Sequence, residues 1–159
     1  MDSRAQVIVV SHDGSRAADA AFRWALAQAR AVSGKLRVVR AWTMKSAPRP
    51  RTQTIGYVPP IEDFEEAVVE ALSADCARIS AGYDDLDIAC SAVRGPAVNK
   101  LLEAAADADL LVVGARGLGG FRGLALGSVS DQLVRHSPCP VVVVRDAHSA
   151  ETDRTLPPE

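Results

Sequence analysis

The sequence of 159 residues lacks an excess of charge of either sign and contains few cysteines. Its 18 Lys and Arg residues and 20 Asp and Glu residues leave a net charge of −2 at pH 7. This balance provides no broad electrostatic attraction for nucleic acids or anionic membranes, so we expect neither as a partner. The three cysteines, Cys76, Cys90 and Cys139, are odd in number and have no CxxC spacing. We expect them to pack as small apolar side chains in a reduced compartment, by default the cytoplasm.

Long hydrophobic runs are also absent. No apolar run approaches the roughly 18 residues that a membrane-spanning helix needs. The first ten residues, MDSRAQVIVV, contain no long apolar region ahead of a cleavage site, which a secretory signal would require. The sequence therefore predicts a soluble, cytoplasmic protein that neither crosses a membrane nor is exported.

Three common sequence motifs of nucleotide-binding and hydrolytic sites are missing. The only Gly-Lys pair, Gly34-Lys35, is followed by Leu36 instead of Ser or Thr, which excludes a P-loop. Residues 11–15 contain a single glycine, so the GxGxxG pattern of NAD and FAD sites is absent after the first apolar run. Gly127 and Ser128 do not form the GxSxG elbow of a serine hydrolase.

What the sequence contains is an alternation of short apolar runs with amphipathic segments. The runs predict five strands, at residues 7–10, 36–41, 86–93, 110–113 and 141–144. The segments between them carry apolar residues at three- and four-residue steps, which predicts helices, the fourth from about Ser128 to His136. This alternation predicts a doubly wound parallel sheet. The length predicts a single domain, residues 1–146, and the polar residues 147–159 predict a disordered tail.

Residues 43–60 interrupt this rhythm. They contain four prolines and three basic residues and show neither helical nor strand periodicity. A loop of this length inside a compact domain is usually functional or disordered, and its place after the second strand puts it near the edge where ligands bind. We predict a mobile flap.

The most informative stretch is residues 114–130, GARGLGGFRGLALGSVS, which follows the fourth apolar run. Glycine has no Cβ, so Gly114, Gly117 and Gly127 can adopt positive φ and let an anion approach the main chain, while Ser128 lies where a helix should begin. A tight turn would explain one glycine. Six glycines within fourteen residues lose much conformational entropy on folding, which favours a phosphate-binding role.

The spacing of this stretch is Gly114, two residues, Gly117, nine residues, then Gly127 and Ser128, and it resembles the nucleotide-binding signature of the universal stress protein family. The HDGS segment at residues 12–15, Trp42, and SPCPVVVV at residues 137–144 extend the resemblance over nearly the whole chain. The resemblance implies a five-stranded parallel sheet in the order 3-2-1-4-5 with helices on both faces, an adenine nucleotide alpha hydrolase-like fold.

The resemblance also implies a nucleotide site. It assigns the glycine stretch with Ser128 and Ser130 to the phosphates, Asp13 to the nucleoside, and the backbone of Ala41 to adenine. The predicted nucleotide-binding residues are Asp13, Ser15, Ala41, Gly114, Arg116, Gly117, Gly127, Ser128, Val129 and Ser130.

Several of these residues have simpler structural interpretations. Asp13 or Ser15 can cap the first helix, and Ser128 can form a capping pair with Asp131 at the fourth. Arg116 either neutralises phosphate or is simply solvated. His12 stands where the family usually has an apolar residue. It is a proton acceptor or a polar residue at the rim of the site, and we favour the rim.

The resemblance implies an ATP-binding regulatory or sensory protein with slow or no hydrolysis, and we predict no catalytic residues and no metal site in the protein. Mg²⁺ is expected to accompany ATP, held mainly by phosphate oxygens and water. Two alternatives are an enzyme that transfers a phosphoryl or adenylyl group, and an interaction protein with a vestigial site. Residues 141–144 form an apolar edge strand, which predicts a homodimer unless the tail covers that edge. The signalling partner is not identified by the sequence.

Overall fold

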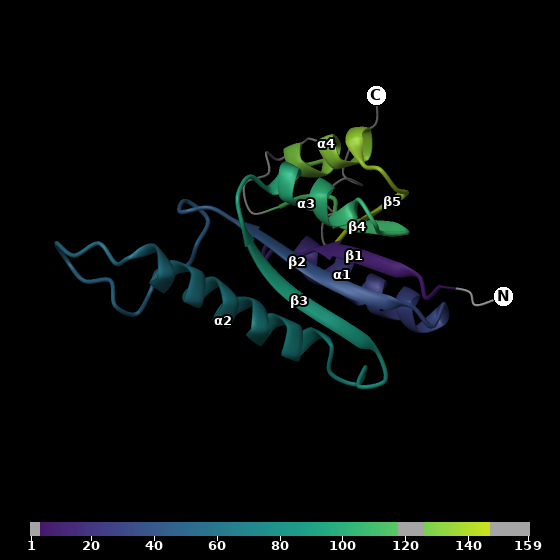
Figure 1. Ribbon diagram of the computed structural model, residues 1–159, viewed down its shortest axis with the longest axis horizontal. Helices are drawn as coiled ribbons and strands as arrows, with labels where there is room; N and C mark the ends of the chain where they lie inside the picture. The colour runs from purple at the N-terminus through teal and green to yellow at the C-terminus, as the bar shows by residue number, and fades with distance from the viewer. Residues whose placement is uncertain (1–3, 118–125, 147–159) are drawn as a thin grey trace, which may run out of the picture.

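The protein folds around a five-stranded parallel sheet in the order β3-β2-β1-β4-β5, as predicted. The computed structural model describes residues 4–117 and 126–146. Within these residues four helices alternate with the strands (Figure 1). The elements are β1 (Val7–Ser11), α1 (Arg16–Ala31), β2 (Lys35–Trp42), α2 (Ile61–Ile79), β3 (Asp87–Arg94), α3 (Ala97–Ala105), β4 (Leu110–Gly114), α4 (Ser128–His136) and β5 (Val141–Val144). Each predicted strand lies within about two residues of an observed one.

The two faces of the sheet are covered by different helices. On one face Ile8 and Val10 of β1 pack in a core with the apolar stripes of α1 and α2. On the other face Val9 packs with Leu101 of α3 and Leu133 of α4. Because successive residues of a strand point to opposite faces, a run of consecutive apolar residues is what a strand covered on both sides requires. Figure 1 shows α3 and α4 together on one side of the sheet.

The order of the strands reverses between β1 and β4. Ile8 to Val10 of β1 pair with Leu110 to Val112 of β4, although about a hundred residues separate them in the chain. The carboxyl ends of these two strands therefore lie side by side, at the position where open parallel sheets bind ligands. At the far end of the sheet, β5 pairs only with β4 and forms an edge.

The expectation that all three cysteines are free apolar side chains is wrong for two of them. Cys76 of α2 and Cys90 of β3 form a disulfide, and only Cys139 is free. The two residues are 14 positions apart, and the contact arises because α2 packs on β3. Sequence spacing alone does not show that contact, because connectivity depends on how the helix lies on the sheet.

Residues 43–60 form a long connection without helix or strand, as predicted. It is held to α2 by a hydrogen bond from Thr52 Oγ1 to Asp63 and by the exposed ion pair of Arg51 with Glu70. Ile55 and Val58 are fully exposed or nearly so. The mobility of this segment stays a prediction, and the predicted tail, residues 147–159, lies outside the described residues.

Among the described residues, none of the helices is both long and apolar enough to cross a membrane.

Candidate functional site

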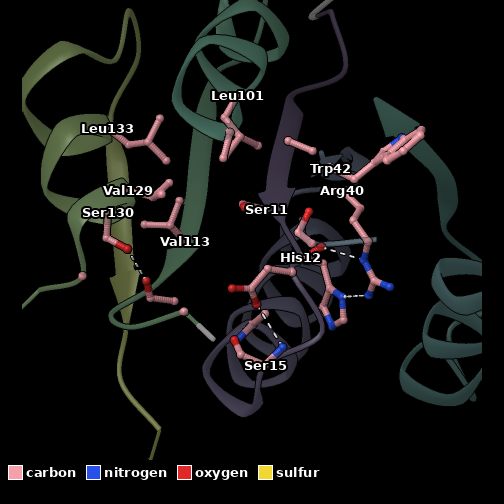
Figure 2. A pocket seen from close by; sticks show the side chains of 18 of the residues that line it. Ser11, His12, Ser15, Arg40, Trp42, Leu101, Val113, Val129, Ser130 and Leu133 are labelled. Atoms are coloured by element: carbon pink, nitrogen blue, oxygen red, sulfur yellow. Dashed lines mark hydrogen bonds between the residues drawn. The ribbon is translucent and has the colours of Figure 1, made fainter. Parts of the chain in front are cut away.

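A cavity of about 580 Å³ opens at the carboxyl ends of β1 and β4. Figure 2 shows Leu101, Val113 and Leu133 on one side of it, and His12 and Arg40 on the other. All ten predicted nucleotide-binding residues line this one cavity: Asp13, Ser15, Ala41, Gly114, Arg116, Gly117, Gly127, Ser128, Val129 and Ser130. They come from three separate parts of the sequence, and the topology of the sheet brings them together.

The segment after β1 and the segment after β4 touch directly. A Cβ atom added to Gly117 would lie only 2.6 Å from Oδ2 of Asp13. Glycine is thus the residue that lets the Asp13 carboxylate and the main chain of residue 117 approach this closely. These two segments, about a hundred residues apart in the sequence, therefore line one crevice.

The three signature glycines do not adopt the positive φ that the sequence suggested for them. The described glycines with positive φ are Gly14, Gly56, Gly82 and Gly95, and none of these belongs to the signature. The reasons for glycine are steric instead. A Cβ on Gly114 would lie 2.8 Å from the carbonyl carbon of Ala17, so glycine lets α1 pack against β4. Gly127 has φ −67° and is the N-cap of α4. The glycines at 119, 120 and 123, and Arg122, lie outside the described residues.

The N-terminus of α4 has no side-chain cap. Ser128 is the first helical residue, not the cap, so the predicted capping pair with Asp131 is wrong. Asp131 instead accepts a hydrogen bond from Arg135. The N–H groups of a first helical turn have no acceptor within the helix, and their partial positive charge favours an anion. Residues 128–130 therefore present amide donors at the wall of the cavity.

Ser130 differs from Ser128 in its surroundings. Its Oγ is buried and donates a 2.6 Å hydrogen bond to the carbonyl of Gly114, which ties the start of α4 to the end of β4. Ser128 is exposed at the cavity. Of the two hydroxyls, that of Ser128 is the one placed to reach a ligand.

At the N-terminus of α1, the sequence left either Asp13 or Ser15 as the capping residue. Ser15 is the N-cap, and its Oγ accepts a 3.1 Å hydrogen bond from the N–H of Ala18. Asp13 is not the cap. Its Oδ1 accepts a 2.9 Å hydrogen bond from the N–H of Ser15, which shapes the turn that faces Gly117.

His12 is not at the rim. Its side chain is fully buried, with Nδ1 at 2.5 Å from Nη2 of Arg40 and Nε2 at 2.8 Å from Oδ1 of Asp19. A guanidinium can only donate, so Nδ1 must be the acceptor and Nε2–H donates to Asp19. The two neighbours therefore select the neutral Nε2–H tautomer of His12. Figure 2 shows the imidazole facing the guanidinium of Arg40.

This contact is part of a closed ring of five side chains. Arg40 donates to Asp75 at 2.8 Å, Arg78 donates to Asp75 at 3.0 Å and to Asp19 at 3.1 Å, and Asp19 completes the ring through His12. We call His12, Asp19, Arg40, Asp75 and Arg78 the charged ring. Arg40 Nε also donates to the carbonyl of His12 at 2.9 Å, so the ring fixes the main chain next to Asp13.

The charged ring changes the pKa of Asp75 and that of Arg78. Burial alone would raise the pKa of Asp75, but hydrogen bonds from Arg40 and Arg78, together with the charge of Arg40, outweigh it and lower the pKa. The hydrogen bonds that Arg78 donates to Asp75 and Asp19 raise the pKa of Arg78. Asp75 and Arg78 are therefore held in their ionised forms at neutral pH.

Sequence reasoning missed Arg40, which lines the cavity and is buried. One signal was available, because an arginine in the otherwise apolar strand VVRAW needs a partner if the strand is covered. Trp42 also lines the cavity, and its Nε1–H is buried without a partner among the described residues. Arg116, by contrast, is half-buried at the cavity and has no ion pair within the described part of the chain.

A resident metal site is not visible in residues 4–117 and 126–146, where no cluster of three or more His, Cys, Asp or Glu side chains could hold an ion.

Comparison with known proteins identifies the family. The family model described as the universal stress protein family matches residues 5–145. A universal stress protein of Mycolicibacterium smegmatis is 33% identical over 148 residues, which cover 91% of this chain but 47% of that protein. A universal stress protein of Thermus aquaticus is 35% identical over 147 residues, with 88% of this chain and 98% of that protein covered.

A solved structure titled as a universal stress protein in complex with cAMP has a TM-score of 0.65 and 30% identity, and the match covers 90% of this chain and 98% of that one. The chain spans about half the length of the mycobacterial relatives it matches. With a family match over nearly the whole chain, this protein belongs to the universal stress protein family.

Proposed function

We propose that this protein binds ATP in the cavity at the carboxyl ends of β1 and β4 and uses the nucleotide as a regulatory or sensory signal in a stress response. The observation that carries the proposal is the meeting of three anion-binding features in one cavity. These are the first turn of α4, which no side chain of the described residues caps, the bare main chain at Gly117, and the guanidinium of Arg116, which has no ion pair among the described residues. The cAMP complex of a relative at 30% identity supports an adenine nucleotide as the ligand.

The arrangement suggests how the ligand lies. The triphosphate would accept hydrogen bonds from the amides of residues 128–130, the ribose would lie near Asp13, and adenine would lie near the backbone of Ala41. Mg²⁺ would be held mainly by phosphate oxygens and water, because the described residues offer no metal cluster. We place the protein in the cytoplasm, where its ligand is available.

Calorimetry with nucleotide-stripped protein tests the proposal. We expect saturable binding of ATP with Mg²⁺, and we expect Arg116→Ala to weaken it by about tenfold or more, because one hydrogen bond to a charged group contributes about 1.5 to 3 kcal/mol. Arg23→Ala is the matched control, since Arg23 is an exposed arginine of α1 outside this cavity. Absence of saturable binding, or equal losses in both variants, would reject the proposed site.

A regulatory role implies slow turnover. Rapid hydrolysis needs a positioned water and a general base, and Asp13, the carboxylate nearest Gly117, already accepts a hydrogen bond from the main chain of Ser15. We expect phosphate release from Mg²⁺-ATP well below about one turnover per second, the low end of ordinary catalysis. Faster release would instead favour a phosphoryl-transfer enzyme.

We further propose a homodimer through β5, which would transmit the nucleotide state to an unidentified signalling partner. The four valines of this edge strand remain half-buried, and one side of the strand is unpaired within the described residues. A lysine at the edge disfavours pairing between strands. Native mass spectrometry should therefore show a dimer for the natural protein and a monomer for Val142→Lys. A monomer in both cases would remove the dimer from the proposal.

A further inference from the structure

The Cys76–Cys90 disulfide lies beside the charged ring that supports the cavity. Asp75 and Arg78, two members of the ring, flank Cys76 on α2. The disulfide joins this part of α2 to β3, and contacts between the two elements are otherwise formed by noncovalent packing. The position of Asp75 is thus constrained by the disulfide of the adjacent Cys76 and by the hydrogen bond from Arg40.

The ring connects this bond to the cavity through Arg40. The guanidinium of Arg40 receives its orientation from Asp75 at 2.8 Å and holds the carbonyl of His12 at 2.9 Å. His12 immediately precedes Asp13, the carboxylate that lies against the main chain of Gly117 at the cavity. A shift of α2 would therefore be transmitted through the side chains of Asp75 and Arg40 to the main chain next to Asp13.

The disulfide is accessible on one side. Cys76 is buried, with 8% of its surface exposed, whereas Cys90 is exposed on β3. A thiolate can attack a disulfide only at a sulfur that it can reach. In a cytoplasmic protein, moreover, a disulfide is usually transient and either catalytic or redox-sensing, because cellular thiols keep permanent disulfides rare.

We propose that Cys76 and Cys90 are a reversible thiol–disulfide site that controls the affinity of the cavity for its nucleotide, the disulfide form binding more tightly. This inference rests on the proposed ATP site. The substrate class is a dithiol reductant. One of its thiolates attacks Sγ of Cys90, the bond between Cys90 and Cys76 breaks, and Cys76 leaves as a thiolate that takes up a proton. The second thiol of the reductant then attacks the mixed disulfide, which releases Cys90 as a thiol and leaves the reductant as a disulfide.

Reduction loosens α2 without unfolding the domain. Leu72 and Ile79, on either side of Cys76, pack in the core between the sheet and α1, and we expect this noncovalent packing to persist on reduction. What reduction removes is the covalent tie of α2 to β3, so Asp75 and Arg78 lose their fixed position and Arg40 loses its orientation. The expected effect is a partial loss of affinity, since the amides of α4 belong to the opposite wall.

Coupling between two sites is reciprocal. If reduction weakens ATP binding by some factor, bound ATP must make the disulfide harder to reduce by the same factor. Coupling of this kind typically changes affinity by about 5- to 150-fold, and we expect a value near the lower end.

The test is an ATP titration by calorimetry on Cys139→Ser, which keeps the Cys76–Cys90 pair and removes the free thiol. We expect reduction with dithiothreitol to weaken ATP binding about fivefold or more. Cys90→Ser should bind as weakly as the reduced protein and should not respond to dithiothreitol. Equal affinity in the oxidised and reduced states would overturn the redox inference and leave the ATP site intact, whereas absence of ATP binding in both states would overturn both.

Two further measurements test whether the loss of affinity on reduction comes from unfolding of the whole domain. Hydrogen exchange of the amides of residues 75–79 should speed up on reduction, while exchange in β1 and β4 should stay slow. In a dithiol redox buffer, saturating ATP should raise the ratio of disulfide to dithiol by the factor measured in the titration. A reduced protein that exchanges rapidly throughout, or a ratio that ATP does not move, would contradict the inference.

Discussion

The two walls of the cavity are built in different ways. On the side of β4 and α4, apolar side chains such as Val113 and Leu133 line the cavity beside the main-chain atoms of Gly117 and of the uncapped first turn of α4. On the side of α1 and α2, His12 and Arg40 line the cavity, and both are fixed by hydrogen bonds within the charged ring. The α4 side offers main-chain hydrogen-bond donors to a ligand, whereas most donors on the side of the charged ring are already bonded to other protein groups.

This difference indicates that one wall recognises the charge of a ligand and that the other fixes the position of Asp13. Arg40 and Arg78 are neutralised by Asp19 and Asp75, so this side adds little net positive charge to attract phosphate. Arg116 and the helix N-terminus remain available on the other side. We infer that the α4 wall binds phosphates and the ring wall holds Asp13 in place.

The largest expected effect is on the α4 wall. Replacing Gly117 and Gly127 together with valine should obstruct the approach of phosphate to the main chain. The loss of two charge-assisted hydrogen bonds, about 1.5 to 3 kcal/mol each, would weaken ATP by about two to four orders of magnitude. Calorimetry measures the loss, and circular dichroism checks that the fold is retained. An unchanged affinity would mean that the two walls do not differ as described.

A smaller effect, on stability, should distinguish the ring from an ordinary surface ion pair. Arg40→Met removes the hydrogen bonds of Arg40 to Asp75 and His12, which then keep only Arg78 and Asp19 as partners. Breaking this largely buried pair should lower the free energy of unfolding by about 3 kcal/mol. Arg37→Met is the matched control on the same strand. The pair of Arg37 with Asp107 has a similar length, 2.7 Å, but both side chains are at least 40% exposed. Urea denaturation should show a large shift in midpoint for Arg40→Met and almost none for Arg37→Met. Equal shifts would show that the charged ring stabilises the fold no more than an exposed ion pair does.

The smallest effect concerns pH. The pKa of Asp75 is lowered in the folded protein, from an ordinary value of 3.8, so its ionised form stabilises the fold above that value. This stabilisation is lost as the pH falls through the lowered pKa. The stability difference between the natural protein and Asp75→Asn should therefore be constant near neutral pH and shrink below about pH 4. A difference that stays the same down to the acid transition would show that the carboxylate charge of Asp75 does not contribute.

The sequence predicted the α4 wall and the topology but not the ring wall. Glycine spacing and apolar runs are local patterns. They predict the strands and site residues such as Gly117 and Ser128, and the resemblance to the family supplies the strand order. The ring joins His12, Arg40 and Asp75 from three different elements, and no local pattern relates them.

The errors have the same origin. His12 was assigned to the rim because its partners, Arg40 and Asp19, are not visible from its neighbours in the sequence. The Cys76–Cys90 bond was missed because it depends on how α2 lies on β3. Positive φ was expected at Gly114 because glycine permits it, whereas the actual constraint is the close approach of Ala17 from α1.

The most direct test of the division between the two walls is a crystal structure of the protein with ATP and Mg²⁺. We predict phosphate oxygens within hydrogen-bond distance of the main-chain nitrogens of residues 128–130, with the five side chains of the charged ring paired as described above. Phosphates bound to Arg40 or Arg78, or found away from the N-terminus of α4, would contradict the account.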